Sequence, residues 1–146
     1  MIRSIELILS PPSPFLPTPL HSWYNSNTAH QGDGETMRRA LEPILLTAGV
    51  NCIFTGHVHA YERSHPVANN VIQPAGKGIV HFNIGDAGAS LYTSWLPTPA
   101  WSAFHSAVYG HGIFNVLNRT TALWTWHRNQ DAEKVVMDSY YVTNTY

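Results

Sequence analysis

The sequence predicts a fold of the α/β (α+β) class, in which a helix and strands come first and the last third is antiparallel sheet. Three observations support that class. A stretch with helical spacing over residues 33–48 is followed directly by a short apolar stretch over 50–55. That order is typical of α/β units, in which functional side chains gather at the carboxyl ends of strands. Residues 112–117, 122–127 and 135–142 are rich in β-forming residues and are separated by polar turns.

The first stretch along the chain is a proline-rich segment. Residues 10–20, SPPSPFLPTPL, contain five prolines. Proline fixes its own φ, lacks a backbone donor and restricts the residue before it, so we expect an extended, unpacked chain here. The sequence thus predicts two parts: residues 1–20, a proline-rich segment that is either unstructured or not homologous to the rest, and one domain over residues 21–146.

The helix is predicted over residues 33–48, DGETMRRALEPILLTA. Asp33 is a candidate N-cap, Gly49 follows as a stop signal, and a kink is expected at Pro43. The apolar residues of one face recur at helical spacing: Met37, Leu41, Leu45 and Ala48.

The strands follow the helix. The 50–55 stretch is a buried strand, in which the single cysteine, Cys52, is expected to be a small buried hydrophobe. Residues 78–84, GIVHFNI, form a second strand that ends in the turn-rich sequence GDAGAS. A long aromatic loop is predicted over 91–111, and the three antiparallel strands come after it.

Composition excludes several classes of function. Charged residues make up 12% of the chain and the net charge is -1, so no nucleic-acid partner is expected. No run approaches the roughly 18 apolar residues that a membrane-spanning helix requires, so no membrane association is expected. Glu6 interrupts the apolar amino terminus and prolines follow it, so no signal peptide is predicted.

Histidine is the informative residue type, with 9 in the chain. The stretch TGHVHAYER places His57 and His59 one residue apart, directly after a predicted strand. Two imidazoles on irregular backbone can point at one small volume, which suits a metal ion. His21 and His30 lie at the two ends of the polar, turn-forming stretch HSWYNSNTAH. Lone histidines are usually surface or hydrogen-bonded residues, and we expect no site role for His65, His81, His105, His111 and His127.

Several segments together resemble the carboxyl-terminal half of plant-type purple acid phosphatases, which are calcineurin-like metallophosphoesterases. They are GHVHAYERSHPV, HSWYNSNTAH, GETMRRALEPIL, IGDAG, WSAFHSAVYGHG and WHRNQD. The resemblance covers roughly residues 21–142, in order and with sensible spacing. It implies the carboxyl-terminal part of a four-layer αββα sandwich.

The resemblance also implies a chemistry and a set of site residues. The family hydrolyses phosphate monoesters at acidic pH with Fe(III) paired with Zn, Mn or Fe. His57 and His59 match the family's Gly-His-x-His motif, and His21 matches the histidine that opens its His-x-Pro-Trp-Tyr-Asn motif. By this match His59 is a ligand of the ferric ion, whereas His57 and His21 hold the divalent one. His30 matches a histidine that contacts the phosphate and is a candidate proton donor to the leaving alkoxide.

The sequence departs from the family pattern in three places. The proline after the first histidine is missing, and Ala29 stands where the family often has a second histidine. The family's earlier Asp-x-Gly, Gly-Asp-x-x-Tyr and Gly-Asn-His motifs have no counterpart here. The nearest imitation, around Asp86, lacks the tyrosine and aligns with a carboxyl-terminal family segment instead, so we reject it as a ligand motif.

Two readings of the function follow. The first is an acid phosphatase, as the resemblance implies, with phosphate monoesters as substrates. In this reading the chain is a fragment or a truncated gene model that lacks several metal ligands. Its partner is a second copy in a homodimer or a separate chain. The alternative is a catalytically inactive remnant that binds one metal ion or none. The family implies secretion or a vacuolar location, and Asn118 in the sequence Asn-Arg-Thr is a glycosylation acceptor compatible with it.

Overall fold

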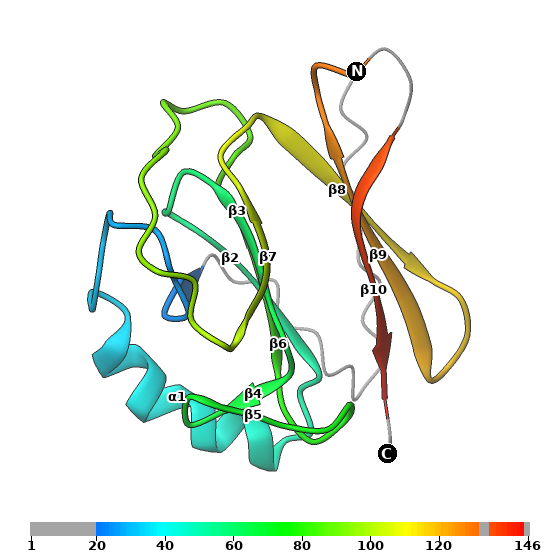
Figure 1. Ribbon diagram of the computed structural model, residues 1–146. Helices are drawn as coiled ribbons and strands as arrows, with labels where there is room; N and C mark the ends of the chain where they lie inside the picture. Colours follow the sequence, from blue (N-terminus) through cyan, green and yellow to red (C-terminus); the bar gives the residue numbers. More distant parts are fainter. Residues whose placement is uncertain (1–19, 132–134, 145–146) are drawn as a thin grey trace.

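The computed structural model describes residues 20–131 and 135–144. Within these residues the chain is mostly β, with one helix (Figure 1). A five-stranded mixed sheet has the order β1-β2-β6-β3-β7, a three-stranded antiparallel sheet has the order β10-β9-β8, and β4 and β5 form a hairpin. The prediction for the proline-rich segment lies outside the described residues, apart from its last residue, Leu20.

The elements, in chain order, are β1 (Leu20–His21), α1 (Glu35–Thr47), β2 (Cys52–Gly56), β3 (Tyr61–Ser64), β4 (Val67–Ala68), β5 (Val71–Ile72), β6 (Val80–Ile84), β7 (Ser102–Ser106), β8 (Gly110–Val116), β9 (Thr121–Arg128) and β10 (Val136–Thr143).

Helix α1 confirms the predicted helix, although its start differs. Gly34 occupies the N-cap position without a side-chain hydrogen bond, so the prediction that Asp33 caps the helix is wrong. Gly49 ends the helix as expected, at φ 73, and the amide of Val50 donates to the carbonyl of Leu45 at 3.0 Å. This pair of features is a Schellman C-cap. Pro43 lies inside the helix.

The buried face of α1 differs from the apolar stripe that the sequence predicts. Its buried residues are Arg38, Glu42 and Leu45, whereas Ala48 is exposed. Arg38 pairs with Glu42 at 2.7 Å, and Tyr24 donates to the same carboxylate at 2.8 Å. The face therefore buries two charges, which is tolerable because they are paired and hydrogen-bonded.

The hydrophobic core lies between the two larger sheets. Its buried members come from β2, β3, β6, β9 and β10: Cys52, Tyr61, Val80, Phe82, Trp124, Trp126 and Val142. The rings of Tyr61 and Trp126 stack at 4.5 Å with an interplanar angle of 5°. The thiol of Cys52 is buried as predicted, and burial raises its pKa to about 12. This core holds the five-stranded sheet in place, and the histidine motif follows the carboxyl end of its strand β2.

The predicted strands are confirmed, but the sequence missed others. The 91–111 loop prediction is wrong, because β7 lies inside this range and pairs with β3. Strand β3 and the β4–β5 hairpin were also missed. Asn69 and Asn70 join β4 to β5 with φ values of 49° and 63°, as a two-residue turn with positive φ at both positions requires.

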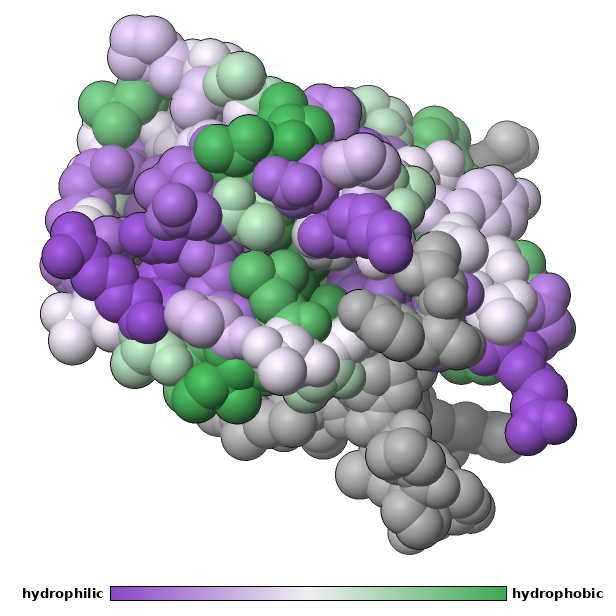
Figure 2. Space-filling view, turned by 90° about the horizontal axis from the view of Figure 1, so that it is seen from below, coloured by the Kyte–Doolittle hydropathy of each residue, from purple (hydrophilic) through white to green (hydrophobic). Residues whose placement is uncertain are grey.

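Apolar side chains remain exposed at the end of the molecule formed by α1 and the hairpin, among them Ile44, Val71 and Ile72. Figure 2 shows hydrophobic residues in separate groups among hydrophilic ones on the face seen from below. Within the described ranges, no helix is long and apolar enough to cross a membrane.

His81 lies in the core, so the expectation that it is a surface or hydrogen-bonded histidine is wrong. Its side chain lies on β6, is 2% exposed and contacts the rings of Trp23 at 5.3 Å and Tyr24 at 4.6 Å. Neither ring nitrogen has a hydrogen-bond partner among the residues that the structure describes. Burial lowers the pKa of His81 to about 3, because no group compensates a charge at this position.

We predict that His81 makes the protein less stable in acid. Below pH 6.5 the unfolded chain binds a proton at this histidine and the folded chain does not. The free energy of unfolding therefore has its full value above pH 6.5 and decreases as the pH falls toward 3. The free energy of unfolding should fall by about 1.4 kcal/mol per pH unit in this window. Urea unfolding of wild type and His81→Phe at several pH values measures it, and equal slopes for both proteins would contradict the prediction.

Candidate metal centre

Three histidines and one aspartate meet at one end of the five-stranded sheet. One ligand atom from each of His21, His30, Asp33 and His57 lies within 4.8 Å of the others. Nε2 of His57 lies 3.2 Å from Nδ1 of His30, which in turn lies 3.0 Å from Oδ2 of Asp33. Nε2 of His21 lies 4.0 Å from the same carboxylate oxygen. The structure thus brings together three of the four histidines that the sequence predicts for the site.

The strand arrangement explains why His21 and His57 meet. Strands β1 and β2 are parallel neighbours, and His21 is level with Gly56, the residue before His57. The carboxyl ends of adjacent parallel strands lie at the same sheet edge, where α/β folds place their functional side chains. His30 and Asp33 reach this edge from the turn before α1.

Two of the histidines have unusual backbone conformations. His30 has φ 59° and His57 has φ 74°, both in the left-handed region that residues other than glycine seldom adopt. Such conformations cost about 1–3 kcal/mol each and gather at functional sites. The two values mark these residues independently of their side-chain chemistry.

His59 lies outside the group of four. Its ring stacks on Tyr92 at 4.5 Å and 7°, and its Nδ1 lies 2.9 Å from the carbonyl oxygen of Ser90. Nδ1 of His21 faces the carbonyl of Ser22 in the same way, at 3.1 Å. A histidine that donates one ring N–H to a backbone carbonyl has its tautomer fixed, and its other nitrogen is then the one suited to a metal.

The segment that carries His21 and His30 is anchored by a buried glutamate. Glu62 of β3 is 3% exposed and accepts from the amide of Ser26 at 2.8 Å, from its hydroxyl at 2.5 Å and from the hydroxyl of Ser102 at 2.6 Å. Burial raises the pKa of Glu62, and these hydrogen bonds oppose the rise. The sequence offered no signal for this anchor, since 36 residues separate Ser26 from Glu62.

The sequence also assigned Asp33 to a helix cap and so missed it as a site residue. In the structure its carboxylate contributes the single acidic side chain of the group. Burial lowers the pKa of His57, as do its neighbours His30 and His21, whereas Asp33 raises it. The lowered pKa favours neutral imidazole, the form that ligates metals. Imidazole nitrogens and carboxylate oxygens are both ligands that bind zinc in proteins.

Other candidates lie away from this group. Asp86 is 1% exposed and accepts from the indole Nε1–H of Trp126 at 2.9 Å. Its rejection as a ligand motif is thus consistent with its core position. His105 stacks on Trp95 at 4.1 Å, and His111 pairs with His127 across β8 and β9. These histidines join no metal-binding group within the described ranges.

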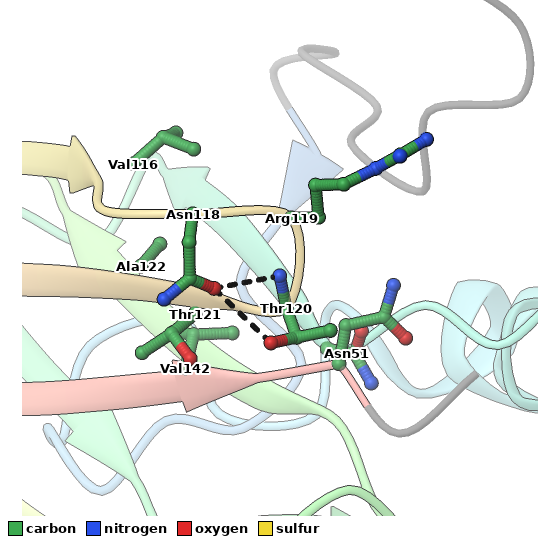
Figure 3. Close-up of a pocket in the computed structure, with 9 residues that line it drawn as sticks. Asn51, Val116, Asn118, Arg119, Thr120, Thr121, Ala122 and Val142 are labelled. Carbon is green, nitrogen blue, oxygen red and sulfur yellow. Dashed lines mark hydrogen bonds between the residues drawn. The ribbon is translucent and has the colours of Figure 1, made fainter.

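A pocket lies at the turn between β8 and β9, away from the metal centre. The pocket, of about 160 Å³, is lined by Asn51, Val116, Asn118, Arg119, Thr120, Thr121, Ala122, Val142 and Asn144 (Figure 3). Oδ1 of Asn118 accepts from the amide of Thr120 at 2.9 Å and from its hydroxyl at 3.1 Å. The pocket shares no residue with the metal centre, and Asn118 is exposed. The glycosylation of Asn118 stays a prediction.

Comparisons with known proteins point to one family. Residues 78–139 match the family model described as iron/zinc purple acid phosphatase-like protein C. The chain is 46% identical over 127 residues to purple acid phosphatase 18 of Arabidopsis thaliana, covering 84% of the chain and 28% of that protein. It is 41% identical over 134 residues to purple acid phosphatase 22 of the same plant, covering 89% of the chain and 30% of the relative.

A solved structure agrees with these relatives. The purple acid phosphatase PPD1 from yellow lupin (Lupinus luteus) seeds superposes with a TM-score of 0.65 and 25% identity, over 70% of this chain and 19% of that one. The chain thus spans less than a third of the length of these proteins.

Proposed function

Since this chain carries the carboxyl-terminal region of the plant purple acid phosphatase family, we propose that it serves metal-dependent hydrolysis of phosphate monoesters, as part of an acid phosphatase site. The observation that carries the proposal is the meeting of His21, His30, Asp33 and His57 at the carboxyl ends of two parallel strands. Comparable sets of histidine and carboxylate ligands hold catalytic zinc in other folds.

The metal ligands that we propose are His21, His57 and His59. The residues of the group fit a divalent ion, Zn, Mn or Fe, which His21 and His57 would hold. His59 would serve the Fe(III) position, and its Nδ1 contact with Ser90 supports a role for Nε2 as ligand. When bound, such a metal pair neutralises the charge that develops on the transferring phosphoryl group. Fe(III) prefers anionic oxygen donors, and Asp33 is the single carboxylate that the described group offers.

His30 is the residue that we propose as proton donor. Its Nδ1 faces the carboxylate of Asp33 at 3.0 Å and its Nε2 faces the hydroxyl of Tyr92 at 3.4 Å. When the imidazole is protonated, Asp33 accepts from Nδ1 and orients the ring, so Nε2–H is the proton available to a leaving alkoxide. The same cation stabilises the phosphate of the substrate, and both tasks are favoured in acid.

The complete fold, the glycosylation, the location and the oligomeric state are part of the same proposal. The observed sheets and helix would be part of a four-layer αββα sandwich, Asn118 would carry a glycan, and the protein would be secreted or vacuolar. A homodimer is one arrangement that would cover its exposed apolar residues, such as Tyr141 at 60% exposure.

The alternative is a protein without catalytic activity that binds one metal ion or none. Two observations favour it. The group holds a single carboxylate, and the 146 residues have no counterpart of the family's further aspartate, tyrosine and asparagine motifs. A second alternative is a site completed by a separate chain that supplies these ligands.

We predict that the chain binds zinc and that His57→Ala weakens binding. The loss of a group that merely supports a ligand costs tenfold to a hundredfold in metal affinity, so the loss of the ligand should cost at least about tenfold. Calorimetric zinc titration measures the change. His65→Ala is the matched control, because His65 is exposed and lies outside the group. An identical heat signal in wild type and His57→Ala would contradict the ligand assignment.

We predict that the isolated chain hydrolyses p-nitrophenyl phosphate only at background rate after Fe and Zn are supplied at acidic pH. Members of a catalytic site act together, and the absence of several removes nearly all rate enhancement. Turnover that disappears in both His57→Ala and His30→Ala would show instead that these residues suffice for catalysis.

A further inference from the structure

Asn83 contacts the histidine turn from the neighbouring strand. It lies on β6, is 2% exposed, and donates through Nδ2 to the carbonyl of Val58 at 2.9 Å and to that of Ala60 at 2.6 Å. These two carbonyls lie on either side of His59, and Val58 directly follows His57. A single buried amide group therefore ties down the backbone that presents both histidines.

The orientation of this amide follows from its surroundings. Two carbonyl oxygens face Nδ2, so the reversed amide would place oxygen against oxygen. Oδ1 is buried and has no hydrogen-bond partner in the part of the chain that the structure describes. An unpaired buried acceptor is unfavourable, and asparagine is uncommon in strands. A β-branched residue would suit this strand position better, so the two donated hydrogen bonds explain why asparagine occupies it.

The turn needs such support because its backbone is strained. His57 has φ 74°, and the amide of Ala60 donates to the carbonyl of Val58 at 2.8 Å, which closes the chain tightly around His59. Gly85, the residue after β6, is also close to the turn: a Cβ atom at this position would lie 1.9 Å from the carbonyl oxygen of Val58. Asn83 is level with Thr55 of β2, just before the turn begins.

We propose that Asn83 is a positioning residue for the metal centre: its two donated hydrogen bonds hold the Gly56–Ala60 turn in the conformation that sets the places of His57 and His59. The inference rests on the proposed function, because it assigns Asn83 a role in a site whose metal ligands are themselves proposed. It adds a residue from β6, a strand that contributes no ligand.

The test compares Asn83→Leu and Asn83→Thr with wild type in the full 146-residue chain. Leucine matches the size of asparagine and has no donor, whereas threonine suits a strand and retains one donor. We expect zinc affinity to fall about tenfold or more in Asn83→Leu and by less in Asn83→Thr. Amide hydrogen exchange should be about tenfold faster at Ala60 and Tyr92 in Asn83→Leu, because their amides donate to the carbonyls of Val58 and His59.

Ser64→Ala is the matched control. It removes a buried hydrogen bond between β3 and β6, which the amide of His81 donates to the hydroxyl of Ser64 at 2.9 Å, at the end of these strands away from the turn. It should leave zinc affinity and exchange in the turn unchanged. Unchanged exchange and zinc affinity in Asn83→Leu would overturn the proposal. If wild type binds no zinc, the proposed function fails, and exchange at Ala60 and Tyr92 still decides whether Asn83 holds the turn.

Discussion

The parallel pairing of β1 with β2 is the contact on which the rest of the site depends. It places His21 of β1 level with Gly56, the last residue of β2, and so brings His21 close to His57, which directly follows β2. The two strands are held from the other side by β6, which pairs in parallel with β2 and contributes Val80 and Phe82 to the core. The core between the sheets therefore determines the position of a site that lies at its rim.

Buried polar contacts, rather than apolar packing, hold the loops that carry the proposed ligands. Glu62 fixes the segment around Ser26, and the Tyr24–Glu42 hydrogen bond ties the same segment to α1. Buried carboxylates are costly unless they are fully hydrogen-bonded, and both of these are. Because the left-handed backbone at His30 and His57 is itself unfavourable, these contacts preserve a geometry that the local sequence alone would not adopt.

The sequence predicted what depends on local pattern. Helix α1, β2, β6 and the three carboxyl-terminal strands follow from periodicity and turn residues. That His21, His30 and His57 lie together was expected from their spacing and from family resemblance. The sequence-based predictions failed where contacts between residues distant in the chain determine the structure. Strand β7 reads Ser-Ala-Phe-His-Ser, which has little β-propensity, and forms because β3 offers an edge. Asp33 satisfied a local capping rule, yet its carboxylate instead faces His30 across a turn.

In the proposed metal centre, His21 of β1 and His57, which directly follows β2, bind one metal ion. X-ray absorption at the zinc edge of the zinc-loaded chain tests this most directly, because imidazole rings produce a multiple-scattering pattern that water and carboxylate do not. We expect imidazole scattering in wild type that weakens in both His21→Ala and His57→Ala. A spectrum with oxygen ligands alone, or one that neither substitution alters, would contradict it.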